Sequence, residues 1–527
     1  MPIASLTGST AGIEEAVVLL LIIAAAVAIV ARRIGVPYTI GLTLVGLAVG
    51  VGAHVESLRL SSDLVFYVFL PVLLFEAGFH LDAAHLRDQW RRILALAVPG
   101  VLVAFALTAV GVHYLGGMAW SLALLFGALI AATDPVSVVS LFRRLGVSQR
   151  LTTLVDAESL FNDGAAAVLF AVVLAVVVDG HEFTAAWAAG KFLWMAAGGL
   201  VAGLVVGYAA SFVHRHLDDH IIEITLSTIV AYGSFLLGQA LGMSGVVACV
   251  TAAIVLGNLG RRRTMSPVTR VTMDTVWEYA AFVANSLIFL LIGLSMHLSL
   301  IGAHVGLVLI AFVVVVAARA VVVYGYGLIS RPFGGLPFRW QHVLVWGGLR
   351  GTIALALVLS VPAAFAGRQT LEVVTFGVVL LSLVGQGLTV PWLTRRLGLA
   401  GEEQSVARRR REALLEGFVS AHEELDRLQE AGVMPRTERD HLERTIEEQE
   451  GMLLEGMAPL SDEPAEGEEE RLTERLGALL AQRRRIEALR HAGALAGATA
   501  GELVDEVDRR IALLGERLAC ERGEEDC

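Results

Sequence analysis

Cysteine is scarce in this chain, and no basic stretch precedes its first apolar run. The 527 residues include three cysteines: Cys249 lies in an apolar run, and Cys520 and Cys527 lie near the end. Thiols so placed imply no disulfide framework and suit a tail that faces a reducing compartment. Because residues 1–12 contain no basic stretch, we interpret the first apolar run as a retained helix rather than a cleaved signal.

The sequence also lacks a nucleotide-binding loop and an obvious cluster of metal ligands. His80 and His85 lie at the end of one apolar run, and His214, His216 and His220 share a short polar loop. We expect the loop histidines to be solvated, with metal binding or pH sensing as the alternative. These absences argue against a membrane-embedded enzyme, and we expect no cofactor and no nucleic-acid partner.

Apolar residues, in contrast, are abundant. The chain is 56% hydrophobic, and its mean hydropathy is +0.68, which is typical of a polytopic membrane protein. Residues 1–400 carry a net charge of +3, whereas residues 401–527 carry −14. We therefore predict a transmembrane domain over 1–400 and an acidic cytoplasmic tail over 401–527. Three heptad-like stripes in the tail predict a small helical bundle or a dimerising coil, with a regulatory sensor as the alternative.

Runs of apolar residues predict an all-α fold with thirteen transmembrane helices. The arginines in the loops predict its orientation: seventeen fall on one side, against Arg59, Lys191 and Arg368 on the other. By the positive-inside rule, the N-terminus lies outside and the tail is cytoplasmic, in a multi-pass protein of the cell membrane. The predicted spans are 13–31, 37–53, 63–80, 92–112, 119–142, 151–178, 187–212, 220–238, 243–259, 274–296, 300–328, 339–361 and 370–394.

The stretch 156–164 places acidic residues at the start of an apolar run that continues to Val178. A carboxylate in a bilayer costs about 2.5–3.5 kcal/mol on insertion scales, so Asp163 needs either a bound cation or an arginine partner. Ser159 lies four residues earlier, on the same helical face, and offers a second oxygen ligand. Asn162 can hold a neighbouring backbone group or carboxylate in place.

A second acid, Asp134, stands between Thr133 and Pro135 in another apolar run. Proline interrupts a helix and frees carbonyls that can face a cation, although a kink with a solvated Asp134 is the alternative. Glu76 is a third acid within an apolar run, near its end, where it can also simply reach water. Two acids at mid-membrane depth predict a site for a small monovalent cation.

A second interruption is predicted where Gly347, Gly348 and Gly351 surround Arg350. Transporters carry such broken helices in corresponding positions of inverted repeats, and the fifth and twelfth spans fit two six-helix repeats. Asp134 and Arg350 have the signs that would balance the helix ends at the two breaks. Arg319 also lies inside an apolar span, and we expect it to pair with Glu158.

Together these residues resemble a known family, the sodium/proton antiporters of the NhaP and NHE branch, over roughly residues 13–397. The resemblance implies thirteen helices, a mobile core domain, an interface domain that forms a homodimer, and elevator-like alternating access. Exchange of a monovalent cation for protons is implied, one-for-one because Asn162 stands where electrogenic relatives have aspartate. The motifs that carry the resemblance are Thr133-Asp134-Pro135, Glu158-Ser159-x-x-Asn162-Asp163 and Gly347-Gly348-Leu349-Arg350-Gly351.

The resemblance also implies roles for single residues. Asp163 would carry the cation and the proton, and together with Asp134 it would bind Na⁺. Ser159, Glu76 and the Thr133 carbonyl would complete the cation shell. Asn162 and Thr133 would hold the crossing, Glu158 would pair with Arg319, and Arg350 would support the second break. Potassium or lithium in place of sodium stays open, and a cation channel or a structural scaffold are the rival interpretations.

Overall fold

The computed structural model describes residues 10–34, 37–52, 62–215, 219–260, 267–295, 302–331 and 335–401. The chain divides into two units, Met1–Ala407 and Arg408–Cys527. All the described residues belong to the first unit. The predicted tail helices and His216 lie outside the described residues, so their placement stays a prediction.

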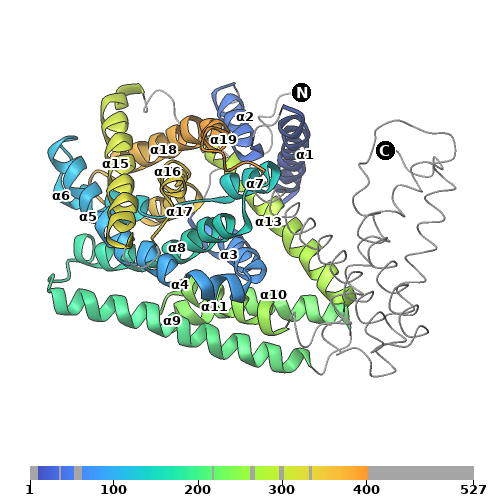
Figure 1. The fold of residues 1–527 in the computed structure, drawn as a ribbon. Helices are drawn as coiled ribbons and strands as arrows, with labels where there is room; N and C mark the ends of the chain where they lie inside the picture. The colour runs from blue at the N-terminus through green and yellow to red at the C-terminus, as the bar shows by residue number, and fades with distance from the viewer. Residues whose placement is uncertain are drawn as a thin grey trace, which may run out of the picture. The chain divides into compact units, whose positions relative to one another are not determined.

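Every regular element in these described ranges is helical (Figure 1). Long runs of Ala, Val and Leu account for this, because a helix satisfies its backbone hydrogen bonds internally where no water is present. The helices are α1 (Thr10–Ile34), α2 (Tyr38–Gly52), η2 (Leu64–Phe69), α3 (Leu70–His80), α4 (Ala83–Ala97), α5 (Pro99–Tyr114), α6 (Trp120–Ile130), α7 (Val136–Leu145), α8 (Gln149–Val177), α9 (Ala185–His214), α10 (His220–Ala240), α11 (Gly245–Val255), η3 (Leu256–Gly260), α13 (Pro267–Ser295), α15 (Val305–Ile329), α16 (Phe338–Trp346), α17 (Thr352–Ser360), α18 (Arg368–Leu381), η5 (Ser382–Gln386) and α19 (Gly387–Arg396).

Seven helices in the described part of the chain are long and apolar enough to cross a membrane, and five shorter apolar helices accompany them. The surface agrees with this. On α9, for example, Leu193, Trp194 and Val205 are each at least 60% exposed. Apolar side chains in such density on an outer face are typical of contact with lipid. An all-helical polytopic membrane fold is thus confirmed, whereas the number of thirteen crossings stays a prediction.

The two predicted interruptions are present. Helix α6 ends at Ile130 and α7 begins at Val136, so that residues 131–135 are irregular and include Pro135. Helix α16 ends at Trp346 and α17 begins at Thr352, with three glycines between them. The amide of Asp134 donates to the carbonyl of Leu349 at 2.7 Å. The two breaks therefore meet inside the protein.

Helix α8 lies at the centre of the helices that surround these breaks (Figure 1). It contacts α3, α4, α5, α6, α7, α9, α11 and α17. Most of its side chains are buried, including the polar residues Glu158, Ser159 and Asn162. An amphipathic stripe would bury only one face of a helix, so a helix buried nearly all round is a core element.

Helices α2 and α13 pack closely through glycine. A Cβ on Gly46 would overlap the carbonyl of Leu290 and approach the Cα of Gly293 within 3.1 Å. Small residues at such crossings let two membrane helices approach backbone to backbone. Helix α13 also contacts α17, directly after the second break, and it carries Asn285.

Candidate functional site

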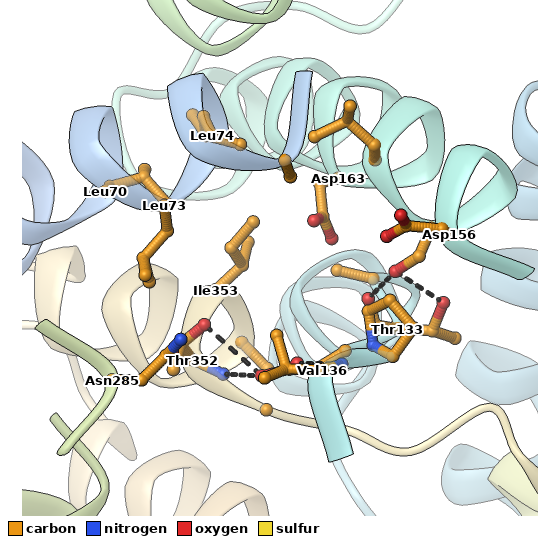
Figure 2. Close-up of a pocket in the computed structure, with 18 residues that line it drawn as sticks. Leu70, Leu73, Leu74, Thr133, Val136, Asp156, Asp163, Asn285, Thr352 and Ile353 are labelled. Carbon is orange, nitrogen blue, oxygen red and sulfur yellow. Dashed lines mark hydrogen bonds between the residues drawn. The ribbon is translucent and has the colours of Figure 1, made fainter. Parts of the chain in front are cut away.

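A pocket opens beside the two breaks, between α3, α8, α13 and the start of α17 (Figure 2). It encloses about 560 Å³ of space, including the part open to solvent. Leucines and alanines form much of its wall. The polar side chains on the wall are those of Thr133, Asp134, Asp156, Ser159, Asp163, Asn285 and Thr352. Three carboxylates around one small pocket make it a candidate site for a cation.

Asp134 binds the amino ends of two helices at once. Its Oδ1 accepts from the amide of Val136 at 3.2 Å, at the start of α7. Its Oδ2 accepts from the amide of Thr352 at 3.3 Å, at the start of α17. A Cβ on Gly351 would collide with this carboxylate, so only glycine allows the approach. The negative charge thus lies where both helix dipoles favour it.

Arg350 performs the complementary task at the carboxyl end of α6. Its Nη1 donates to the carbonyls of Ala131 and Ala132, both at 2.9 Å. The guanidinium is almost fully buried, with the residue only 3% exposed. These carbonyls have no partner within α6 because the helix stops there. The signs predicted from the sequence for Asp134 and Arg350 are therefore matched by their contacts.

A hydrogen-bond network ties the first break to α8. The amide of Thr133 donates to Oδ1 of Asn162 at 3.1 Å, and Nδ2 of Asn162 donates to the Thr133 hydroxyl at 2.6 Å. The hydroxyl of Ser159 donates to the Thr133 carbonyl. Asn162 thus faces the backbone of the break rather than the pocket. Ser159 contacts the break and also lines the pocket.

Glu158 and Arg319 form the predicted ion pair. Nη1 and Nη2 of Arg319 donate to Oε1 and Oε2 of Glu158, each at 2.8 Å. The Arg319 side chain is only 7% exposed and the Glu158 side chain only 2%. Asn162 adds a bond to Oε1 of Glu158 at 3.2 Å. This bidentate pair joins α15 to α8 and leaves neither charge for a ligand.

Asp163 differs from the other acids of this region. Within the residues that the structure describes, its carboxylate has neither a hydrogen bond nor an ion pair, and Figure 2 shows it pointing into the pocket. Asp156, two helical turns earlier on α8, lines the same pocket and likewise has no such partner in the described ranges. The pocket therefore holds two carboxylates that form no ion pair or hydrogen bond in this part of the chain.

Glu76 does not line the pocket. Its carboxylate lies 3.3 Å from Nδ1 of His80, one turn along α3, and Nε2 of that histidine lies 3.3 Å from Asp274 on α13. The pocket wall on this helix consists of Leu70, Leu73, Leu74 and Ala77. The structure thus brings together Asp163, Asp134, Ser159 and Thr133, but places Glu76 with a histidine.

Three polar residues of the pocket wall are not among the site residues expected from the sequence: Asp156, Asn285 and Thr352. The spacing of seven residues between Asp156 and Asp163 could have shown that both lie on one face of a helix. Thr352 follows the glycine break directly, where a helix amino end is expected. For Asn285 the sole signal was one amide in an apolar span, which does not say what it faces.

Interrupted helices that cross within an apolar bundle, beside a pocket of carboxylates, define a secondary ion transporter. Comparison with known proteins identifies which kind. A profile of the family described as "Sodium/hydrogen exchanger, transmembrane" matches residues 18–396. The chain belongs to this family of cation/proton antiporters, whose members are transporters and not enzymes.

Individual relatives agree. The low-affinity Na(+)/H(+) antiporter NhaS1 of Synechocystis sp. is 40% identical over 70% of this chain and 71% of its own. The Na(+)/H(+) antiporter ApNhaP of Aphanothece halophytica is 39% identical, with the same coverage of both chains. The structure of the sodium proton antiporter MjNhaP1 from Methanocaldococcus jannaschii superposes with a TM-score of 0.61 at 21% identity, covering 73% of this chain and 98% of that one. The last likeness shows a shared fold.

The buried ion pair yields a stability prediction. Replacing Arg319 by Gln leaves Glu158 charged and unpaired, so the unfolding free energy should fall by about 3–5 kcal/mol. Adding Glu158→Gln should recover a large part of that loss, because the double variant buries no charge. Thermal unfolding of the purified protein in detergent measures both changes.

The pair between Arg368 and Glu372 on α18 provides the control, since its side chains are 24% and 27% exposed. Arg368→Gln should cost only about 0–1 kcal/mol. Equal losses for Arg319→Gln and Arg368→Gln would contradict a structural role for the buried pair.

Proposed function

We propose that this chain exchanges a monovalent cation, Na⁺ first of all, for H⁺, and that Asp163 carries the two in turn. The single observation that carries the proposal is the unpaired carboxylate of Asp163 in a pocket beside two crossing helix breaks. Membership of the sodium/hydrogen exchanger family supports it. Potassium exchange by the same residues is the second candidate, because residue types alone do not set the size of the site.

Competition for one carboxylate explains why such a protein exchanges rather than leaks. Asp163 holds either a proton or a cation, and in each case the side chain is neutralised. The empty carboxylate is charged, and a bare charge is expensive to move past hydrocarbon. Only loaded carriers therefore cross cheaply, so each passage of a cation in one direction is matched by protons in the other.

The proposed cation shell consists of Asp163, Asp134, the hydroxyl of Ser159 and the carbonyl of Thr133. All four residues line the pocket, and hard cations prefer several oxygen ligands. Glu76 remains in the proposal as a ligand that joins only after its contact with His80 breaks. No resident cofactor is needed, since the cation and the proton are the substrates.

Further features belong to the same proposal. We infer thirteen crossings arranged as two inverted six-helix repeats, with the N-terminus outside and the 401–527 tail in the cytoplasm. A core domain with the interrupted helices would move against an interface domain that forms a homodimer in the cell membrane. Exchange would be electroneutral, because Asn162 is neutral and already engaged by Thr133 and Glu158.

The first functional prediction concerns Asp163. In proteoliposomes, Asp163→Asn should reduce Na⁺-dependent proton movement to the protein-free background, because an amide holds neither substrate. The variant should still be purified as a folded protein, since Asp163 has no partner to lose in the described residues.

Asp156→Asn is the matched comparison, because Asp156 is the other unpartnered acid of the pocket. It should keep exchange. If Asp163→Asn stayed active while Asp156→Asn did not, Asp156 and not Asp163 would be the carrier.

A cation flux through the unmodified protein that does not depend on an opposing proton gradient would instead indicate a channel.

A second prediction concerns Asn162. Asn162→Asp retains an oxygen for the amide of Thr133 but places a carboxylate near Oε1 of Glu158, which now lies 3.2 Å from Nδ2 of Asn162. The fold should survive, while the apparent KM for Na⁺ should change by about three- to tenfold, equivalent to about 1 kcal/mol. An unchanged KM would show that Asn162 does not influence the cation site.

Electroneutral exchange gives a further prediction: the unmodified protein should exchange at a rate that does not depend on membrane potential.

A further inference from the structure

Asn285 lies on the wall of the pocket that faces Asp163. It comes from α13, whereas the acids come from α8 and from the first break (Figure 2). The residue is only 5% exposed.

The amide oxygen of Asn285 is buried and has no hydrogen-bond partner in the described residues. Buried carbonyl oxygens nearly always have a hydrogen-bond partner, because burial without one loses the bond that the oxygen makes to water in the unfolded chain. An amide oxygen that is unpaired, inside a protein and on the wall of a pocket with three carboxylates, has the chemistry of a cation ligand.

We propose that the side-chain oxygen of Asn285 is a further ligand of the transported cation, one that reaches it from the wall opposite Asp163. The inference rests on the proposed exchange at Asp163 and adds a ligand to that site. A neutral oxygen strengthens binding of a metal ion, which needs several ligands, more than binding of a proton, which one carboxylate oxygen already holds. Asn285 therefore favours the cation over the proton without changing the charge of the site.

Two replacements of nearly equal size test this. Asn285→Leu removes the oxygen, whereas Asn285→Asp keeps one. At alkaline pH, where proton competition is weakest, Asn285→Leu should raise the KM for Na⁺ about tenfold with little change in maximal rate. Asn285→Asp should keep the KM at or below that of the unmodified protein.

Ser286→Ala is the control for packing. Ser286 is the next residue of α13, is fully buried, and also has a hydroxyl without a hydrogen-bond partner in the described part of the chain, but it does not line the pocket. Its KM should not change. A shift as large for Ser286→Ala as for Asn285→Leu, or an equal loss for the Leu and Asp variants, would overturn the proposal.

A binding measurement separates this inference from the proposed exchange. Na⁺ at alkaline pH should raise the thermal unfolding midpoint of the unmodified protein. The rise should be smaller for Asn285→Leu, and Na⁺ should not change the midpoint of Asp163→Asn. If Na⁺ stabilises Asn285→Leu as strongly as the unmodified protein, the side-chain oxygen of Asn285 is not a cation ligand. The inference then fails, but the proposed exchange at Asp163 is unaffected. If the unmodified protein neither exchanges nor binds Na⁺, the proposed function itself fails.

Discussion

Two opposite charges hold the crossing of the interrupted helices, and the candidate site depends on that crossing. Asp134 satisfies amides at the starts of α7 and α17, and Arg350 satisfies carbonyls at the end of α6. Helix ends in a bilayer core cannot turn to water for these bonds, so each orphan group would cost several kcal/mol if left unpaired. The irregular backbone beside the pocket therefore persists because side chains from each break complete the helix ends of the other.

The acids of the region divide according to what balances them. Glu158 is neutralised by Arg319, Asp134 is held by backbone amides, and Glu76 contacts His80. Asp163 and Asp156 have no such partner among the described residues. The carboxylates that lack such a contact are therefore the two that line the pocket, where a cation could compensate them.

Patterns within one segment could be predicted from the sequence, and so could a distant contact where two buried charges required each other, but other contacts between distant segments could not. Pro135 and the glycines around Arg350 signalled both breaks, and two uncompensated charges in apolar spans signalled the pair of Glu158 and Arg319. Asn285 left no comparable signal, because the direction in which a lone amide points depends on how α13 packs against α2. The place of Glu76 depended likewise on His80 and on Asp274, which lies nearly two hundred residues further along the chain.

The distribution of charge between the two walls fits a carrier whose walls move relative to each other. Asp163, Asp134 and Ser159 belong to segments tied together through Thr133 and Asn162, so they would travel as one body with the ion. Asn285 lines the pocket from α13, a helix that packs closely against α2. A charged ligand there would be left buried and unbalanced whenever the ion moved away, at a cost that a neutral amide avoids. In the proposed motion, a ligand on the wall that does not travel with the ion should therefore be uncharged, as Asn285 is, while the charges that compensate the ion belong to the side that moves with it.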